Sequence, residues 1–272
     1  MKYYKNFQLK KFNSFGLNSI AKEIWFPETL KKLQDLIIKL KGKKFEVLGG
    51  GTNVLLKPQI ARVICLTSMP KGLYLGQNFG VIVDTNYSTN SFISNVIESG
   101  SKGLEGLLGI PGTIGGALVM NAGSGKYSIS DYLLTVTTMD YEGNTHVYHK
   151  DCLKFDRRYS RLQDKKEIVI KALFDFETGK IDQEKIKQIK NYRQNFPKGY
   201  SMGGIFKNWY ALKPYEKEIK AIKSPNLVIS KYLNVIINNG KATFDETIGF
   251  INQIRKIVKE PLELEVKILG DK

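Results

Sequence analysis

Cysteine and histidine are scarce in this chain of 272 residues, which contains two of each. Cys65 and Cys152 lie far apart, so neither a disulfide framework nor a cysteine-based metal site is expected. His146 and His149 are close in sequence, but Gly143 and the alternating pattern around them predict a hairpin arm with both rings on its surface. No metal site is therefore predicted.

Long apolar runs are also absent. No stretch approaches the roughly 18 apolar residues that a membrane span needs, and the first residues lack the apolar core of a signal peptide. A cytoplasmic protein without a membrane span is expected. Hydrophobic residues still make up 42% of the chain, which is ordinary for a globular protein with a sizeable core.

Acidic residues are few relative to basic ones, with 26 Asp and Glu against 42 Lys and Arg and a net charge of +16. Such an excess indicates anionic partners, or lysines that are merely solvated. The basic residues are dispersed, and the densest run, 41–44, holds only three lysines. A basic RNA- or membrane-binding module, the main non-enzyme alternative, would cluster them with exposed aromatic residues. No nucleic-acid partner is expected.

The apolar spacing predicts a mixture of helices and strands. Helical spacing recurs in three segments, which are 30–40, 182–196 and 248–258. Short apolar runs predict strands over 45–48, 81–83, 134–141, 145–148 and 168–176. Alternation of apolar and charged residues from Leu262 to Ile268 predicts a last, half-buried strand.

A first glycine segment reads Val47-Leu48-Gly49-Gly50-Gly51-Thr52-Asn53-Val54. Three glycines after a strand allow backbone N–H groups to converge on one point, which suits the oxygens of a pyrophosphate. The spacing is not the GxGxxG of a Rossmann loop. A tight turn with positive φ is the structural alternative, but three consecutive glycines exceed what such a turn needs.

A second, longer glycine segment covers 103–123 and reads GLEGLLGIPGTIGGALVMNAG. Nine of the chain's 25 glycines lie within 100–125, interleaved with apolar residues. This composition indicates a chain folded at backbone distance against a flat, bulky group. Gly115 and Gly116 would leave room for a ring system, and Asn121 is the polar residue best placed to bond it. Close packing of a helix on a strand is the alternative, but it needs only one or two glycines.

Together the two segments resemble the FAD-contacting segments of the UDP-N-acetylenolpyruvoylglucosamine reductases. The segment Asn13-Ser14-Phe15-Gly16-Leu17 resembles the opening motif of that family, and further matches follow in the family's order at 155–160, 206–208, 234–238 and 264–270. The Ile110-Pro111-Gly112-Thr113 motif is shared with the wider group of vanillyl-alcohol-oxidase-type flavoproteins. The resemblance covers most of the chain.

The resemblance implies an α+β fold. A two-part FAD-binding domain of the vanillyl-alcohol-oxidase type would comprise 1–72 and 73–182. A C-terminal α+β substrate-binding domain would comprise 183–272. A monomer is expected.

The resemblance also implies an activity, the NADPH-dependent reduction of UDP-N-acetylglucosamine enolpyruvate to UDP-N-acetylmuramate through FAD. A non-covalent FAD is expected, because neither glycine segment contains the His or Cys that would attach it. The residues assigned to FAD are Gly49, Gly50, Gly51, Thr52, Asn53, Val54, Ile110, Pro111, Gly112, Thr113, Gly115, Gly116, Asn121, Ala122 and Gly123.

Four further residues take roles from the resemblance. Arg158 matches the family's catalytic arginine, whose guanidinium can hold a carboxylate bidentately. Glu265 matches the catalytic glutamate near the C-terminus. Lys207 and Asn208 match positions that contact the UDP part of the substrate. Arg157 departs from the family, which has Tyr there.

The largest departure is at Gly204, where the family has the serine that donates a proton. Glycine has no proton to give, and Trp209 also replaces a family proline. Three interpretations follow. Ser201, a nearby tyrosine or water supplies the proton instead; or the substrate of the flavoprotein differs; or the chain is an inactive FAD-binding relative. Retention of the other catalytic residues favours the first.

Overall fold

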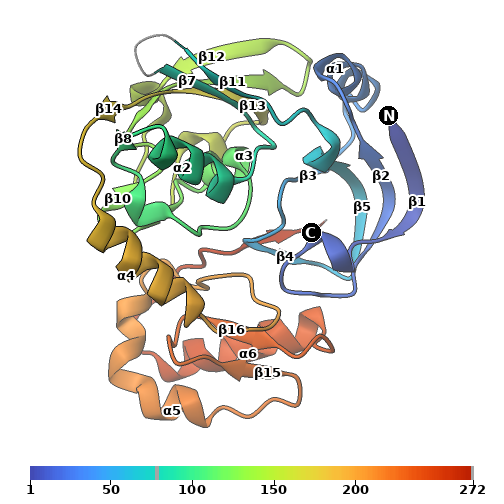
Figure 1. Cartoon of the computed structure of the whole chain (residues 1–272). Coiled ribbons are helices and arrows are strands. Elements are labelled where there is room, and N and C mark those ends of the chain that lie inside the picture. Colours follow the sequence, from blue (N-terminus) through green and yellow to red (C-terminus); the bar gives the residue numbers. More distant parts are fainter. Residues whose placement is uncertain (77–79, 271–272) are drawn as a thin grey trace. The chain divides into compact units, whose positions relative to one another are not determined.

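A computed structural model of the chain describes residues 1–76 and 80–270 (Figure 1). The described chain forms two compact units. The first unit comprises Met1–Lys2, Trp25–Gly50 and Ile64–Phe196, and the second comprises Tyr3–Ile24, Gly51–Val63 and Pro197–Lys272. This division differs from the three ranges expected from the resemblance, because two N-terminal segments group with the C-terminal one. The three-part assignment stays a prediction.

The first unit is built on a five-stranded antiparallel sheet in the order β12-β11-β13-β7-β6. Its strands are β6 (Leu73–Leu75), β7 (Gly80–Asp84), β11 (Leu133–Asp140), β12 (Thr145–His149) and β13 (Glu167–Asp175). The hairpin predicted around Gly143 is confirmed as β11 and β12, which pair from Thr135 with His149 to Met139 with Thr145.

The strand β13 separates two cores of the first unit. Val169 and Phe174 pack in one core with α2 (Thr89–Glu98) and α3 (Ile114–Val119), whereas Ile168 and Ile170 pack in another with α1 (Leu30–Lys39). Because both faces of the strand are buried from Ile168 to Ile170, this part reads as an apolar run without alternation, which ends at the exposed Lys171. The predicted helix over 30–40 is confirmed as α1.

The last helix of the first unit, α4 (Gln183–Gln194), begins where its capping residue predicts. The Asp182 carboxylate accepts from the backbone N–H of Lys185 at 2.8 Å, as an N-cap does. Short strands complete the unit: β3 (Glu46–Leu48), β8 (Ser101–Lys102), β9 (Gly123–Ser124), β10 (Tyr127–Ser128) and β14 (Glu177–Thr178).

Three further strands, β1 (Lys2–Gln8), β2 (Ile20–Phe26) and β5 (Gln59–Cys65), are neighbours in this order in one sheet. Apolar spacing does not predict β1. Nearly all of its residues are exposed, so neither face of the strand has to be apolar and no alternation results.

The second unit has a core around α6 (Phe244–Ile257), where Phe15, Phe206 and Phe250 are fully buried. The helix α5 (Glu216–Ala221) and the antiparallel pair β15 (Leu227–Ile229) and β16 (Ile236–Asn238) contribute to it. The predicted helix over 248–258 is confirmed, but it begins earlier, because Thr243 caps it by accepting from the N–H of Glu246 at 3.1 Å.

The prediction of one strand from Leu262 to Ile268 is wrong. Leu264 forms an isolated bridge with Phe206, whereas the strand β17 spans only Lys267–Leu269 and pairs in parallel with β4 (Val54–Leu56). Because the chain changes partner between the two pairings, the alternation does not continue, and Ile268 is 40% exposed.

The two histidines lie on β12, as predicted. His149 is exposed, and the Nε2 of His146 lies 2.8 Å from the Oδ2 of Asp140 at the start of the turn. Over residues 1–76 and 80–270, no group of three or more His, Cys, Asp or Glu side chains could hold a metal ion. No helix in the same ranges is long and apolar enough to cross a membrane.

Candidate active site

The two glycine segments meet in the first unit. A Cβ added to Gly49 would lie 2.9 Å from the Oγ1 of Thr113, and one added to Gly50 would lie 3.0 Å from the Cα of Gly112. Both distances are tighter than ordinary carbon contacts of about 3.5 Å or more. Glycine at 49 and 50 is therefore what allows the first loop to approach the second.

These neighbouring loops present backbone donors that the protein does not use. Among the described residues, the N–H groups of Gly49, Gly50, Gly112 and Thr113 donate to no acceptor. Gly50 is exposed and the other three are partly exposed. Adjacent unpaired N–H groups form a concave site for the oxygens of an anion.

The adjacent glycines of α3 differ in what surrounds them. A Cβ on Gly115 would lie 2.1 Å from the Oγ1 of Thr85, and the N–H of Gly115 donates to the Thr85 carbonyl at 2.9 Å. Close packing alone therefore requires glycine at 115, which is the alternative explanation given above for glycines in this segment. Gly116 is exposed, and its Cβ would meet only the Oγ1 of Thr113, at 3.6 Å. Its open face leaves room for a flat ligand.

Arg158 lies in a turn that is tied to the end of the second glycine segment. Its Nη2 donates to the carbonyl of Gly123 at 2.7 Å, and its φ of +55° is in the left-handed region. The Nδ2 of Asn121 donates to the carbonyl of Asp156 at 2.9 Å, and its Oδ1 accepts from Ser130 at 2.9 Å. Asn121, which we predicted to bond the cofactor, thus holds the turn that carries Arg158.

Two more side chains fix this turn to α3. Ser160 Oγ and Gln163 Nε2 donate to the carbonyl of Val119 at 2.8 and 2.9 Å, and Gln163 also donates to the carbonyl of Arg158 at 3.1 Å. A Cβ on Gly123 would lie 3.1 Å from the Nη1 of Arg158, so a side chain there would crowd the guanidinium. Hydrogen bonds therefore hold the backbone around Arg158 in place, while the residue stays partly exposed.

In the second unit, Gly204 lies beside an amide and a carboxylate. A Cβ at this position would lie 2.9 Å from the Nδ2 of Asn234 and 3.4 Å from the Oε2 of Glu265. The φ of Gly204 is not in the left-handed region, so its backbone conformation is open to other residues, but the Asn234 amide would have to shift to admit a Cβ. Any side chain placed at 204 would reach toward both groups.

Asn234 is a site residue that we did not predict, although the resemblance includes 234–238. Its Oδ1 accepts from the N–H of Phe206 and its Nδ2 donates to the carbonyl of Phe206, both at 2.9 Å. The N–H of Ile205 donates to the Asn234 carbonyl, and the N–H of Glu265 donates to the Ile205 carbonyl at 2.7 Å. Asn234 therefore fixes the backbone on which Gly204 and Glu265 are placed.

Lys207 and Asn208 use their side chains to hold the C-terminal segment. Asn208 donates from Nδ2 to the carbonyl of Pro261 at 2.8 Å and accepts from the N–H of Glu263 at 3.1 Å. The Lys207 ammonium pairs with the Glu263 carboxylate. Their predicted contact with substrate stays a prediction.

The remainder of the first glycine segment lies in the second unit. A Cβ on Gly51, whose φ is +65°, would lie 2.0 Å from the carbonyl of Phe12, so this position requires glycine without any ligand. Asn53 Nδ2 donates to the backbone carbonyl of Glu265 at 3.2 Å. The cofactor assignments of these two residues stay predictions, as do those of Thr52, Val54, Ile110, Pro111 and Ala122.

No protein-family model matches the chain. A UDP-N-acetylenolpyruvoylglucosamine reductase from Caldanaerobacter subterraneus subsp. tengcongensis is 33% identical over 289 residues, which cover 100% of this chain and 95% of the relative. The chain belongs to the UDP-N-acetylenolpyruvoylglucosamine reductase family. The resemblance found in its glycine segments is therefore confirmed over the full length.

Solved structures agree with this family fold. A crystal structure of UDP-N-acetylenolpyruvylglucosamine reductase from Thermus caldophilus has a TM-score of 0.81 at 26% identity and covers 99% of this chain and 98% of that one. A solvent-stable cholesterol oxidase shares the fold alone, with a TM-score of 0.50, 15% identity and coverage of 65% of this chain and 38% of that one. The predicted flavoprotein-type α+β fold is thus confirmed.

Proposed function

We propose that this protein reduces UDP-N-acetylglucosamine enolpyruvate to UDP-N-acetylmuramate, a step of peptidoglycan precursor synthesis, with NADPH as the hydride source. The observation that carries the proposal is the 33% identity to a reductase over the whole chain. The presence of Arg158 and Glu265 at the positions that match the family's catalytic residues supports it.

The first unit supports a non-covalent FAD. The unpaired N–H groups of Gly50, Gly112 and Thr113 would hold diphosphate oxygens, and the open face of Gly116 would lie against a flat ring. When bound there, FAD would supply the hydride transfer between NADPH and the double bond of the substrate. Neither Cys nor His occurs in the glycine segments, so no covalent attachment is proposed.

Arg158 is proposed to bind the carboxylate of the substrate. A guanidinium has five N–H donors, so it can hold a carboxylate while Nη2 remains on the carbonyl of Gly123. Negative charge increases on that carboxylate as the β-carbon is reduced, and a cation fixed in advance stabilises it without reorganising. The bonds from Gln163 and Asn121 to this turn supply the fixed position.

Glu265 is proposed to supply the proton to the α-carbon, the role that the resemblance gives to a serine at 204. Its Oε2 lies 3.4 Å from where a Cβ of residue 204 would be. The Asn234 amide beside it is bonded to Phe206 at both ends and is not an acid. Ser201 is the competing donor, since its Oγ accepts from the N–H of Gly203 at 3.1 Å and keeps its own proton.

A steady-state assay separates the three interpretations of Gly204. We expect NADPH oxidation that depends on UDP-N-acetylglucosamine enolpyruvate, with a product that is heavier by two hydrogens in the mass spectrum. A yellow protein that oxidises NADPH but leaves this substrate unchanged would indicate a different substrate. A protein that binds FAD but does not oxidise NADPH would be an inactive FAD-binding relative.

A further inference from the structure

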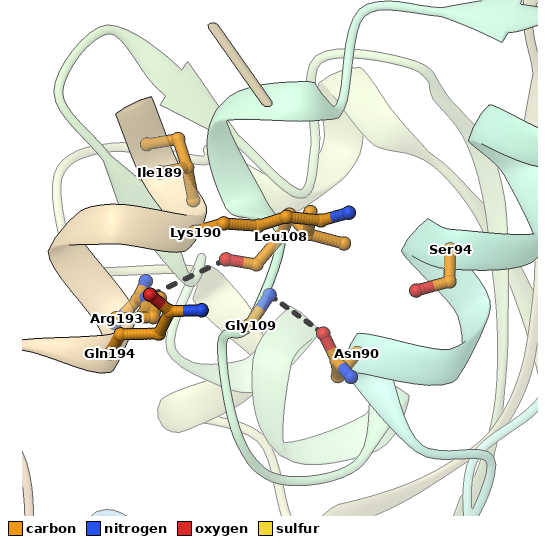
Figure 2. A pocket seen from close by; sticks show the side chains of 8 residues that line it. All are labelled: Asn90, Ser94, Leu108, Gly109, Ile189, Lys190, Arg193 and Gln194. Carbon is orange, nitrogen blue, oxygen red and sulfur yellow. Dashed lines mark hydrogen bonds between the residues drawn. The ribbon is translucent and has the colours of Figure 1, made fainter. Parts of the chain in front are cut away.

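A pocket of the first unit is lined by none of the residues predicted to bind cofactor or substrate. It measures about 290 Å³ and lies between α2, the loop at Leu108 and Gly109, and α4 (Figure 2). Asn90 and Ser94 line it from α2, and Lys190 lines it from α4 together with other residues of the same helix face.

Two cations line this pocket, and no acidic residue among those described does. Lys190 makes no hydrogen bond or ion pair with any described residue, and its side chain extends from α4 toward α2 (Figure 2). Arg193 is half-buried, and its Nε donates to the carbonyl of Leu108 at 3.3 Å. Burial of the Arg193 guanidinium lowers its pKa, and Tyr192 only partly offsets this desolvation. The pocket therefore holds uncompensated positive charge.

The neutral polar groups of the pocket add hydrogen-bond donors. Asn90 Oδ1 accepts from the N–H of Gly109 at 2.7 Å, which leaves the Nδ2 of Asn90 for a ligand. The Ser94 hydroxyl has no hydrogen bond within the described residues. Leu108 and Ile189 supply apolar carbon. The pocket is thus suited to a ligand with a negatively charged head that only accepts hydrogen bonds and with a small apolar part.

We propose that this pocket binds the phosphate group of a small phosphate monoester. A phosphate presents three acceptor oxygens and close to two negative charges at neutral pH, which match two cations and two neutral donors. The site is independent of the proposed reduction, because none of its groups takes part in that reaction. If Lys190 were only a solvated surface lysine, replacing it would affect phosphate binding no more than replacing another lysine of α4.

Titration calorimetry of the purified full chain, at fixed ionic strength, tests the site with inorganic phosphate and phenyl phosphate. The matched variants are Lys190→Gln in the pocket and Lys187→Gln, an exposed lysine of the same helix outside it. Loss of one charged hydrogen bond is expected to weaken phosphate binding about tenfold or more in Lys190→Gln. Lys187→Gln is expected to change it less than about twofold. Ser94→Ala, which keeps every charge, is expected to weaken it about two- to tenfold.

The two probes distinguish the source of the phosphate. Tighter binding of phenyl phosphate than of inorganic phosphate, lost in Lys190→Gln, would support an ester with an apolar group. Equal binding of the two probes would overturn the assignment of an ester and leave free phosphate as the ligand. No binding of either probe at about millimolar concentration would overturn the proposal, as would equal weakening by Lys190→Gln and Lys187→Gln. Circular dichroism melting checks that each variant folds.

Discussion

The first unit keeps a candidate catalytic side chain together with its supporting hydrogen bonds, whereas the second unit keeps the supporting hydrogen bonds around a position that has lost its side chain. In the first unit, Arg158 retains both its side chain and the bonds that hold its turn, to Gly123 and through Gln163 to Val119. In the second unit, the frame around residue 204 is intact, with Asn234 bonded to Phe206, but the side chain at 204 is missing. Positioning and chemistry are thus carried by separate residues, and the second can change while the first is kept.

The largest effect is expected from the acid of the second unit. Glu265→Gln keeps the shape of the side chain but removes the carboxyl group that is the proposed proton donor, so turnover should fall about 10² to 10⁴-fold. The flavin absorbance of the purified protein should not change. Glu260→Gln, an exposed neighbour in sequence, is the control and should behave as the wild type. Wild-type turnover in Glu265→Gln would assign the proton elsewhere, and Ser201→Ala would then be measured in the same assay.

A comparable test in the first unit concerns Arg158. Arg158→Ala should slow turnover by about 10² to 10³-fold, or about 3 kcal/mol, since one contact to developing charge is lost. Arg157→Ala, its exposed neighbour, should change turnover little and controls for the general loss of positive charge. Loss of bound FAD in Arg158→Ala would show instead that this residue belongs to the cofactor site.

Restoring a side chain at 204 tests whether the frame of the second unit is still functional. In the Glu265→Gln background, Gly204→Ser should raise turnover by up to about 10²-fold through the added general acid. Gly204→Ala is the matched control, because both variants bring a Cβ within 2.9 Å of Asn234 Nδ2 and only the serine adds a proton. Equal turnover in the two would mean that the frame no longer directs a hydroxyl to the substrate.

The neighbouring glycines of α3 separate packing from binding within the first unit. Gly115→Ala should lower the free energy of unfolding by about 1 to 3 kcal/mol, since its Cβ would overlap the Oγ1 of Thr85. Gly116→Ala should leave stability equal or raise it by up to about 1 kcal/mol, yet weaken FAD binding. Denaturant unfolding without FAD and titration with FAD measure the two effects. Unchanged FAD affinity in Gly116→Ala would refute the proposed contact.

The smallest effect concerns a turn remote from these residues. Partial burial alone would raise the pKa of Asp140. Hydrogen bonds from His146, Asn144 and Glu142 outweigh this effect and hold the pKa well below its usual range. A depressed folded-state pKa stabilises the protein above the unfolded pKa of about 4, and this contribution is lost as pH falls through the folded pKa. Asp140→Asn should therefore cost about 1 kcal/mol at neutral pH and weaken the acid dependence of Tm.

The control for this turn is Asp151→Asn, an exposed aspartate beside His149. It should change Tm less than Asp140→Asn at every pH. Both variants should keep wild-type NADPH turnover, since neither residue belongs to the candidate site. A turnover defect in Asp140→Asn alone would show that the frame of the first unit depends on its distant hairpin.

Sequence reasoning succeeded where local spacing determines structure. Helix α4 begins at the Asp182 cap, and the hairpin of β11 and β12 turns at Gly143, because both signals lie within a few residues. The strand expected from Leu262 to Ile268 fails because the chain changes pairing partner there, which no local pattern reveals.

The candidate site shows the same limit. The glycine segments were found as motifs, but the contact of Gly50 with Gly112 joins residues far apart in sequence. Likewise, Asn121 and Asn234 are both polar residues in recognised motifs, and only their partners in space show that they hold backbone segments in place. Spacing predicts which residues are present at a site, whereas long-range packing decides which of them position the others.

The central claim is that this chain still completes the reduction despite Gly204, and anaerobic mixing tests it most directly. The yellow absorbance of the FAD-loaded protein should bleach when one equivalent of NADPH is added. It should return when UDP-N-acetylglucosamine enolpyruvate follows, with formation of one equivalent of UDP-N-acetylmuramate. Absorbance that bleaches with NADPH but does not return with this substrate would contradict the claim.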